Sequence, residues 1–557
     1  MTLADVRTSS IPGPTLSIKF SSLASLSEIS SNLSCTSSIE RPPAPLDFAV
    51  LVFFSSVKSP SPSLERYWKE ISLMELAVKM VKTDSFVNEM TEDKTENVLP
   101  LKDLFHISHF SRFYRLYVPA SILVGIVCGL FMVAFQLLIE VTTIAFSALP
   151  IFLAPLIGGI FSGALIYIGR NEIQGSGISK AIEMTHNPTS LRKGTTITKL
   201  VATSISIGSG NPVGREGPAV LIGAGIGNQI GRRLGFKESS HLRVFLMMGS
   251  AAATAGIYKA PLGGALFATE APYKRDARLG YFVPTVIAAI TSFIVFSGIY
   301  SFVTQTGSST LLTFYASYQF TIAEAPLLIF FGIIAGLISI LFAVSLMATR
   351  NFFTLKLPDW ADPIFGSLLA CGVILLALLI AGPQLTIAGM GYEVINFLAE
   401  NPQPILILVI LLFSKLFASS FVVAGRVSGG VLASSLFVGA MLGSVFGEIF
   451  HPENVAGFMV LGMGAVLAAT TNTPVATCIM MLEMSLSFDL VIPLVICITV
   501  SYLVSAGTSL YEGQKISRAD EAIDFYASVN LLPDKKVDLR KATGDENVFD
   551  TGMNRFD

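Results

Sequence analysis

The fold of this chain is decided by residues 249–270, which read GSAAATAGIYKAPLGGALFATE. The pattern returns without a gap at residues 462–483, GMGAVLAATTNTPVATCIMMLE. Chance matching is easy among Ala and Gly, but the paired Pro and Glu favour a true duplication. The paired positions are Gly249 with Gly462, Ala252 with Ala465, Ala255 with Ala468, Pro261 with Pro474, and Glu270 with Glu483.

The repeat extends upstream, where small residues recur at the same spacing. Gly223-Ala224 and Gly227 are echoed by Gly439-Ala440 and Gly443. Small residues let membrane helices approach closely, and short Gly-rich stretches permit helices that break inside the protein. Duplicated halves with broken helices are typical of membrane transporters, whose substrate site lies near the midplane where the halves meet.

Composition places the chain in a membrane. The 557 residues are 52% hydrophobic and 14% charged, with a mean hydropathy of +0.66. Soluble domains carry about 25% charged residues, and a spanning helix needs about 20 mostly apolar ones. A large soluble helical protein would need several unusually long core helices. The uncharged stretches are 116–139, 141–169, 279–323, 325–349, 363–392, 427–447, 454–482 and 490–511.

Several functional classes are excluded by the polar residues. The net charge of −2 gives no reason to expect a nucleic-acid partner. The five cysteines are scattered and the five histidines lie outside the uncharged runs, so we expect no metal and no cofactor. We also expect no enzymatic activity. An intramembrane serine hydrolase using Ser176 would need a nearby histidine base, which the uncharged runs do not supply.

Three regions are expected along the chain. Residues 1–110 form an extension, disordered or upstream of a true start near Met74, Met80 or Met90, with a cytoplasmic helix near its end. A targeting segment is the alternative, but the signal pattern is incomplete. Residues 111–515 form the membrane core, with halves at about 111–300 and 320–515. Residues 516–557 form a short cytoplasmic tail.

Three Gly-rich segments interrupt the apolar pattern, and each precedes a helix-like run. They are GSGIS at 175–179, GREGP at 214–218 and SGGVLA at 428–433. The start of a helix has N–H groups without partners and carries roughly half a positive charge. Several such helix ends aimed at one point make an anion site that holds the ion without trapping it.

Glu216 stands in the second of these segments, just before Pro218, a residue that suits the first helical turn. An intramembrane carboxylate is rare and functional by default. When ionised it would occupy the anion's position, and when protonated it would swing away. The alternative is a static Arg215–Glu216 pair, although adjacent residues on a helix do not face each other.

The three segments, in this order, resemble the ion-site signatures of the CLC family of chloride channels and chloride/proton exchangers. The resemblance covers roughly 110–515 and includes KAPLGGALF at 259–267, NTPVATCIMMLEM at 472–484 and SLYEG at 509–513. It implies an all-α integral membrane fold with two inverted-topology helical repeats and broken helices. It also implies a homodimer with one pore in each subunit.

The resemblance also implies the roles of particular residues. Ser176 and Tyr511 are similar to the residues whose hydroxyls contact the central chloride. Val431 and Leu432 correspond to the positions that give it backbone N–H groups. Glu216 corresponds to the gating and proton-transfer glutamate, and Arg215 and Gly217 lie beside the outer site.

The implied partners are chloride, protons in the case of an exchanger, the lipid bilayer and a second copy of the chain. Basic clusters at Arg112–Arg115, Arg232–Lys237, Lys274–Arg278 and Arg350–Lys356 predict cytoplasmic loops. We therefore expect a multi-pass protein of the plasma (inner) membrane with both termini cytoplasmic. The tail is too short for the family's CBS domains, which favours the prokaryotic type.

Departures from the family pattern leave channel and exchanger both open. Leu432 and Ser434 replace the usual Phe and Pro of the third signature, and Ser179 replaces a Pro in the first. Exchangers usually carry a proton-transfer glutamate where this chain has Ala271. Glu270 precedes it and could serve a secondary proton path, but its pairing with Glu483 in the repeat favours a structural role. Exchange is slightly preferred, with a passive channel as the alternative.

Overall fold

The computed structural model describes residues 107–517, apart from 168–170, 306–310, 315, 317 and 319. The predicted extension and tail lie almost wholly outside these residues. The described part is helical and has only two isolated β-bridges. Its α-helices are α5 (Ile107–Phe146), α6 (Ala154–Tyr167), α7 (Ile178–His186), α8 (Thr195–Gly208), α9 (Glu216–Arg233), α10 (Ser239–Tyr258), α11 (Pro261–Glu270), α12 (Phe282–Thr304), α13 (Ala325–Lys356), α14 (Asp362–Ala381), α15 (Tyr392–Glu400), α16 (Ile405–Ala424), α17 (Leu432–Phe450), α18 (Val455–Thr471), α19 (Pro474–Ser485) and α20 (Val491–Ser505).

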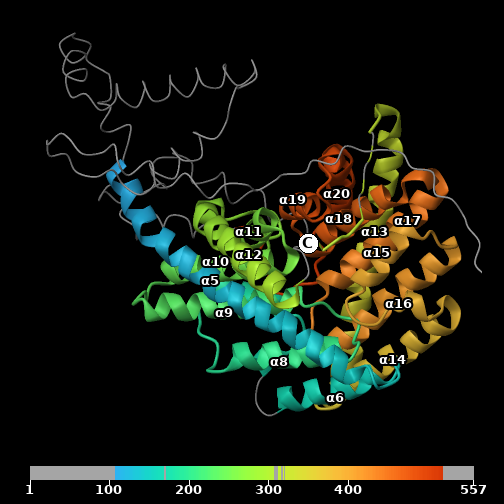
Figure 1. Cartoon of the computed structure of the whole chain (residues 1–557), viewed down its shortest axis with the longest axis horizontal. Helices are drawn as coiled ribbons and strands as arrows, with labels where there is room; N and C mark the ends of the chain where they lie inside the picture. The colour runs from blue at the N-terminus through green and yellow to red at the C-terminus, as the bar shows by residue number, and fades with distance from the viewer. Residues whose placement is uncertain are drawn as a thin grey trace, which may run out of the picture. The chain divides into compact units, whose positions relative to one another are not determined.

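The helices form two sets that repeat the same order of long and short elements. In each set a long helix comes first, α5 or α13, and a nine-residue helix stands third, α7 or α15. Figure 1 shows the first set, from blue to yellow-green, beside the second set, from yellow to red. The apolar stretch 279–323 contains α12, which ends at Thr304.

Reciprocal contacts show that a twofold relation connects the two sets. Gly214 and Gly430 each stand two residues before the first residue of their helix, α9 or α17. They exchange backbone hydrogen bonds in both directions, each of 2.7 Å. Glu270 binds the start of α19, and Glu483 binds the start of α11. Equivalent residues can exchange equivalent bonds only across a twofold axis, so the predicted duplication is confirmed.

The paired glycines of the repeat bring neighbouring helices into backbone contact. A Cβ on Gly223 would lie 2.1 Å from the carbonyl oxygen of Gly249, where α9 crosses α10. A Cβ on Gly439 would lie 2.3 Å from the carbonyl oxygen of Gly462, where α17 crosses α18. Because such distances exclude any side chain, these helix pairs can pack this closely only with glycine at the crossing.

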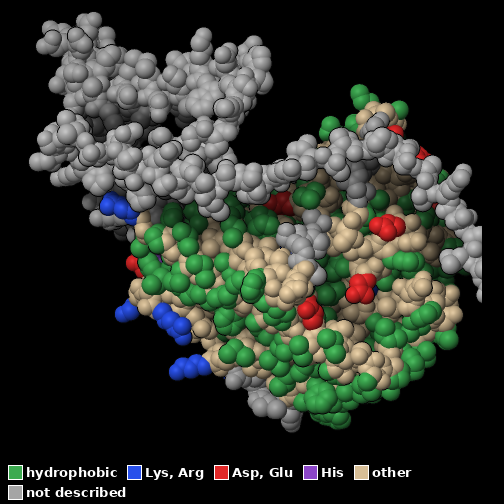
Figure 2. All heavy atoms as spheres, viewed as in Figure 1, with side chains coloured by type: hydrophobic (Ala, Val, Ile, Leu, Met, Phe, Trp, Pro, Cys, Tyr) green, Lys and Arg blue, Asp and Glu red, His purple; other side chains and the backbone are tan. Residues whose placement is uncertain are grey.

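Eight helices in the described residues are long and apolar enough to span a membrane: α5, α12, α13, α14, α16, α17, and α18 and α20 with the short turns before them. Many large apolar side chains on these helices are exposed, as expected for contact with lipid. On the face shown in Figure 2 hydrophobic side chains are widespread, and Lys and Arg gather at one edge. The predicted all-helical membrane fold is therefore confirmed.

The helix crossings give a direct test of this packing. We expect Gly439→Ala to destabilise the protein by about 1–3 kcal/mol, because the added methyl group forces α17 away from α18. Thermal unfolding in detergent measures the change. Gly372→Ala in α14 is the matched control, since a Cβ there would meet nothing within 4 Å. Equal melting temperatures for the two variants would contradict the close crossing.

Candidate anion-binding site

The three Gly-rich segments predicted from the sequence meet at one place. The second and third segments are joined by the Gly214–Gly430 pair. The first joins the third through Gly429, whose N–H donates to the carbonyl oxygen of Gly175 at 3.1 Å. Gly175 in turn donates to the carbonyl oxygen of Arg426 at 3.2 Å. Backbone hydrogen bonds thus hold together the loops that lead into α7, α9 and α17.

Each segment leads directly into a buried helix start. Gly177, with φ of 82°, precedes α7, and Arg215 precedes α9. Val431 precedes α17 and is buried, as is Leu432, the first residue of that helix. The N–H groups in the first turn of a helix have no partner within the helix. The sequence predicted all three broken helices correctly.

Ser176, Gly217 and Gly430 are in direct contact at this point. A Cβ on Gly217 would lie 3.2 Å from the Cβ of Ser176 and 3.2 Å from the Cα of Gly430. The hydroxyl of Ser176 accepts a bond of 3.3 Å from the N–H of Ile178. Gly217 therefore lets the first turn of α9 approach the loop that carries Ser176.

The carboxylate of Glu216 lies at the first turns of both α9 and α17. Glu216 is the first residue of α9 and is 1% exposed. A Cβ on Gly214 would lie 2.1 Å from its Oε2 and 3.1 Å from the backbone nitrogen of Ala433. The Oε1 atom accepts a bond of 2.7 Å from the hydroxyl of Tyr392, whereas Oε2 has no hydrogen-bond partner among the described residues.

Tyr511 reaches the same region from beyond the end of α20. The N–H of Glu512 donates to the hydroxyl of Ser179 at 3.1 Å, which fastens this segment to the first signature. Tyr511 is buried and close enough to Glu216 for an electrostatic interaction. Its hydroxyl has no hydrogen-bond partner in the part of the chain described. The structure thus gathers Ser176, Glu216, Val431 and Tyr511, while their roles toward chloride remain predictions.

Arg215 is buried beside the site, but its guanidinium points to other helices. It donates to the side-chain oxygen of Gln136 in α5 and, at 3.4 Å, to the carbonyl oxygen of Ile257 in α10. Gln136 donates in turn to Glu140 at 2.8 Å. These contacts replace the static Arg215–Glu216 pair considered from the sequence. They also leave the guanidinium directed toward α5 and α10 and not toward Glu216.

Glu270 serves as a helix cap in this structure. Its carboxylate accepts bonds from the N–H groups of Val475 at 3.2 Å and Ala476 at 2.7 Å. Glu483 makes the equivalent pair at the start of α11, at 2.9 and 2.7 Å. Such caps satisfy N–H groups and place negative charge at the positive end of a helix. Glu270 also lines a cavity of about 430 Å³ together with Lys274, Arg275 and Asp276.

Two buried lysines, which the sequence analysis missed, support the helix starts. The Nζ atom of Lys199 donates to the carbonyl oxygens of Ile173 at 2.9 Å and Gly175 at 2.6 Å. The Nζ atom of Lys415 donates to Ile387 at 2.9 Å and Gly389 at 2.6 Å. Each ammonium group therefore holds the Gly-rich turn that precedes α7 or α15.

Tyr392 was also missed, because α15 was not recognised as a fourth broken helix. It begins after GMG at 389–391, the repeat of GSG at 175–177. Gly389 and Gly391 have φ of 63° and 91°, close to 52° and 82° at Gly175 and Gly177. Extending the internal repeat upstream would have found this signal. The hydroxyl contact with Glu216, in contrast, depends on the folded structure.

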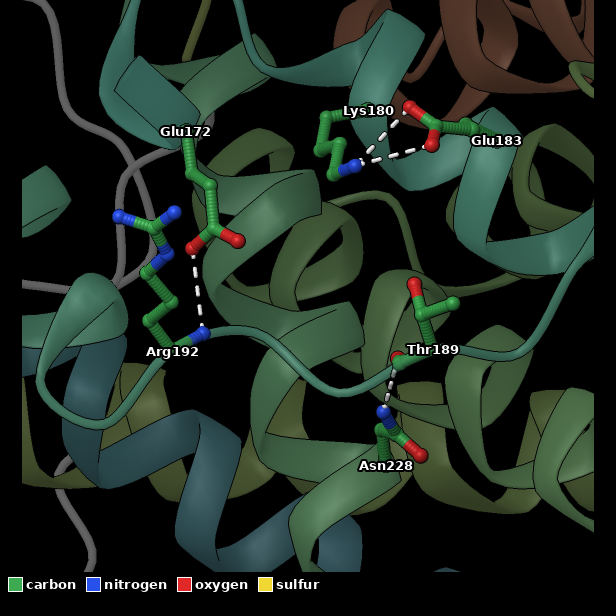
Figure 3. A network of polar contacts seen from close by, with 6 residues as sticks. All are labelled: Glu172, Lys180, Glu183, Thr189, Arg192 and Asn228. Carbon is green, nitrogen blue, oxygen red and sulfur yellow. Dashed lines mark hydrogen bonds and ion pairs between the residues drawn. The ribbon is translucent and has the colours of Figure 1, made fainter. Parts of the chain in front are cut away.

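Polar contacts at the edge of the first half fix the loop between α7 and α8 (Figure 3). The carboxylate of Glu172 accepts a bond of 3.1 Å from the N–H of Arg192. Asn228 in α9 donates to the carbonyl oxygen of Thr189 at 2.6 Å. The loop that follows α7 is thereby tied to α9.

Fold and site together define an integral membrane protein in which broken helices from two related halves surround one buried carboxylate. The family model described as voltage gated chloride channel matches residues 162–506, more than half of the chain. The chain therefore belongs to the voltage-gated chloride channel (CLC) family.

Named relatives agree with this assignment. The chain is 26% identical to the voltage-gated ClC-type chloride channel ClcB of Salmonella typhimurium over 63% of this chain and 83% of that protein. It is 27% identical to the H(+)/Cl(-) exchange transporter ClcA of Vibrio campbellii over 63% of this chain and 76% of that protein. The fold is similar to that of a slow cyanobacterial Cl-/H+ antiporter, with a TM-score of 0.62 and 19% identity over 74% of this chain and 98% of the antiporter.

The caps of α11 and α19 can be tested as a pair. Glu270→Ala and Glu483→Ala should each lower stability by about 1 kcal/mol, because each removes the acceptor for two helix N–H groups. Melting temperatures in detergent compare them with Glu400→Ala, a change at an exposed position at the end of α15. If Glu270→Ala melts like the control while Glu483→Ala does not, the capping role of Glu270 is wrong.

Proposed function

We propose that this protein transports chloride across a membrane through the site where α7, α9 and α17 begin. The observation that carries the proposal is the position of the Glu216 carboxylate at two helix starts, with one oxygen free of hydrogen-bond partners among the described residues. The first turns of two helices, where backbone N–H groups have no partner within the helix, also suit a halide. The names of the relatives, a chloride channel and a chloride/proton exchanger, support chloride as the ion.

The geometry suggests how the ion is held without being trapped. Backbone N–H groups of Val431 and Leu432 and the hydroxyls of Ser176 and Tyr511 replace the hydration shell. Hydrogen bonds and partial charges bind an anion less tightly than a free ammonium group would. Both buried lysines near the site donate to backbone carbonyls, which keeps their full charges turned toward the protein chain.

Glu216 acts as the gate in this mechanism. In its ionised form the carboxylate occupies the place between α9 and α17 that an anion would take, and it repels a second negative charge. Protonation removes that charge and weakens the attraction to the helix starts. The side chain then moves aside and the anion enters, so that one group both opens the path and carries a proton.

The proton carried by Glu216 is the reason to prefer chloride/proton exchange slightly over passive flow. The alternative is a passive channel, because Ala271 has no titratable group and Glu270 is engaged in capping α19. Glu270 also borders a cavity with charged side chains, and a secondary proton path through it stays a prediction.

The proposal includes a homodimer in the plasma membrane with cytoplasmic termini. The dimer follows from the family resemblance, and the orientation follows from the basic clusters that border the apolar stretches. A hydrolase reaction at Ser176 is not part of the proposal, since it would need a histidine base and the uncharged stretches of the sequence contain none.

The gate can be tested by Glu216→Gln in reconstituted liposomes. Chloride flux in the unmodified protein should rise as pH falls, because protonation removes the blocking charge. Glu216→Gln resembles the protonated form and should give flux that is nearly independent of pH. Glu400→Gln, at an exposed position outside the site, should keep the normal pH profile. A pH profile unchanged by Glu216→Gln would show that Glu216 is not the gate.

Coupling between chloride transport and proton transport is tested by imposing a chloride gradient on the same liposomes and recording the internal pH. Exchange predicts that protons move uphill, and that the reversal potential departs from chloride equilibrium. A channel predicts a reversal potential at chloride equilibrium with no uphill proton movement. That second result would replace the exchange mechanism by the passive one.

A further inference from the structure

The Glu216 carboxylate has a single side-chain hydrogen-bond donor among the described residues, and this donor comes from the other half of the protein. The hydroxyl of Tyr392 donates to Oε1 at 2.7 Å, and Tyr392 itself is 8% exposed. A hydroxyl that donates to a carboxylate stabilises its ionised form, because a charged acceptor gives the stronger bond. The bond therefore favours the state in which Glu216 blocks the site.

The position of Tyr392 is fixed by the turn that precedes α15. Gly391, with φ of 91°, is its immediate neighbour, and a Cβ there would lie 2.5 Å from the ring of Phe437. Lys415 holds the same turn through the carbonyl oxygens of Ile387 and Gly389. The backbone leading to Tyr392 is therefore constrained on two sides, which fixes the point from which its side chain extends toward Glu216.

Other charged or titratable groups face Glu216 from the surrounding elements but are engaged differently. Arg215 donates to Gln136 and Ile257, and Lys415 donates to two carbonyl oxygens. Tyr258 at the end of α10 and Tyr511 are both close enough for electrostatic interaction with Glu216. Neither of their hydroxyls has a hydrogen-bond partner in the described part of the chain.

We propose that Tyr392 is the positioning residue that holds Glu216 in its ionised, blocking position and thereby sets the pH at which transport begins. The inference rests on the proposed function of Glu216 and extends it to a residue in the second half. A single hydroxyl links the start of α15 to the start of α9. The two halves consequently share control of the gate, in addition to sharing the anion site.

The test is Tyr392→Phe, which keeps the ring and removes only the hydroxyl. Chloride flux into liposomes should reach half of its maximum at a pH higher by about 1–2 units, as expected for the loss of one hydrogen bond to a charged group. The maximal flux at low pH should stay close to that of the unmodified protein. Tyr258→Phe is the matched control and should leave the midpoint unchanged.

Infrared spectroscopy supplies a measurement that does not depend on transport. The carboxyl C=O band that Glu216→Gln removes should appear in Tyr392→Phe at a higher pH than in the unmodified protein. A purely structural role for Tyr392 would lower stability or flux without moving this titration. In the double variant Tyr392→Phe/Glu216→Gln, flux should match that of Glu216→Gln alone.

The outcomes separate the two proposals. Suppose that Glu216→Gln abolishes the pH dependence of chloride flux, but Tyr392→Phe changes neither the midpoint pH of flux nor that of the infrared band. The role of Tyr392 is then overturned, and the role of Glu216 as the gate stands. A downward shift of the midpoint pH in Tyr392→Phe also overturns the role of Tyr392. An upward shift of equal size in Tyr258→Phe does the same. If Glu216→Gln keeps its pH dependence, the gate itself fails, and the role of Tyr392 fails with it.

Discussion

The structure depends on one backbone pair, the two hydrogen bonds exchanged between Gly214 and Gly430. Each glycine stands just before a helix that begins inside the protein, so the pair places the starts of α9 and α17 side by side. A side chain at either position would collide with the opposite segment: a Cβ on Gly430 would lie 2.9 Å from the nitrogen of Gly217. The proposed anion site therefore lies where the two halves meet.

The twofold relation explains why so many contacts near the site occur twice. Lys199 and Lys415 hold equivalent turns, and Glu270 and Glu483 cap equivalent helices. The functional groups break this symmetry, because Glu216 occupies the first position of α9 whereas Leu432 occupies that of α17. The repeated contacts build the frame, and the residues that differ between the halves include Glu216, the proposed gate.

The sequence predicted the membrane class, the duplication and three of the four broken helices, because Gly, Pro and Glu mark these features locally. Pro218 fixes its own φ, and Gly214 and Gly217 permit close backbone approach that a side chain would prevent, so their spacing is informative without a structure. The direction of Arg215 and the contact of Tyr392 with Glu216 could not be predicted. Both depend on which side chains of distant helices approach, and their residue types are common at membrane interfaces and helix ends.

The central claim is that helix starts from both halves hold an anion and that Glu216 competes with it. Crystals grown with bromide test this most directly, because anomalous scattering locates the ion. The account predicts bromide beside Val431, Leu432, Ser176 and Tyr511, and in Glu216→Gln a second bromide at the place of the missing carboxylate. Bromide bound elsewhere, with none between these helix starts in either protein, would contradict the account.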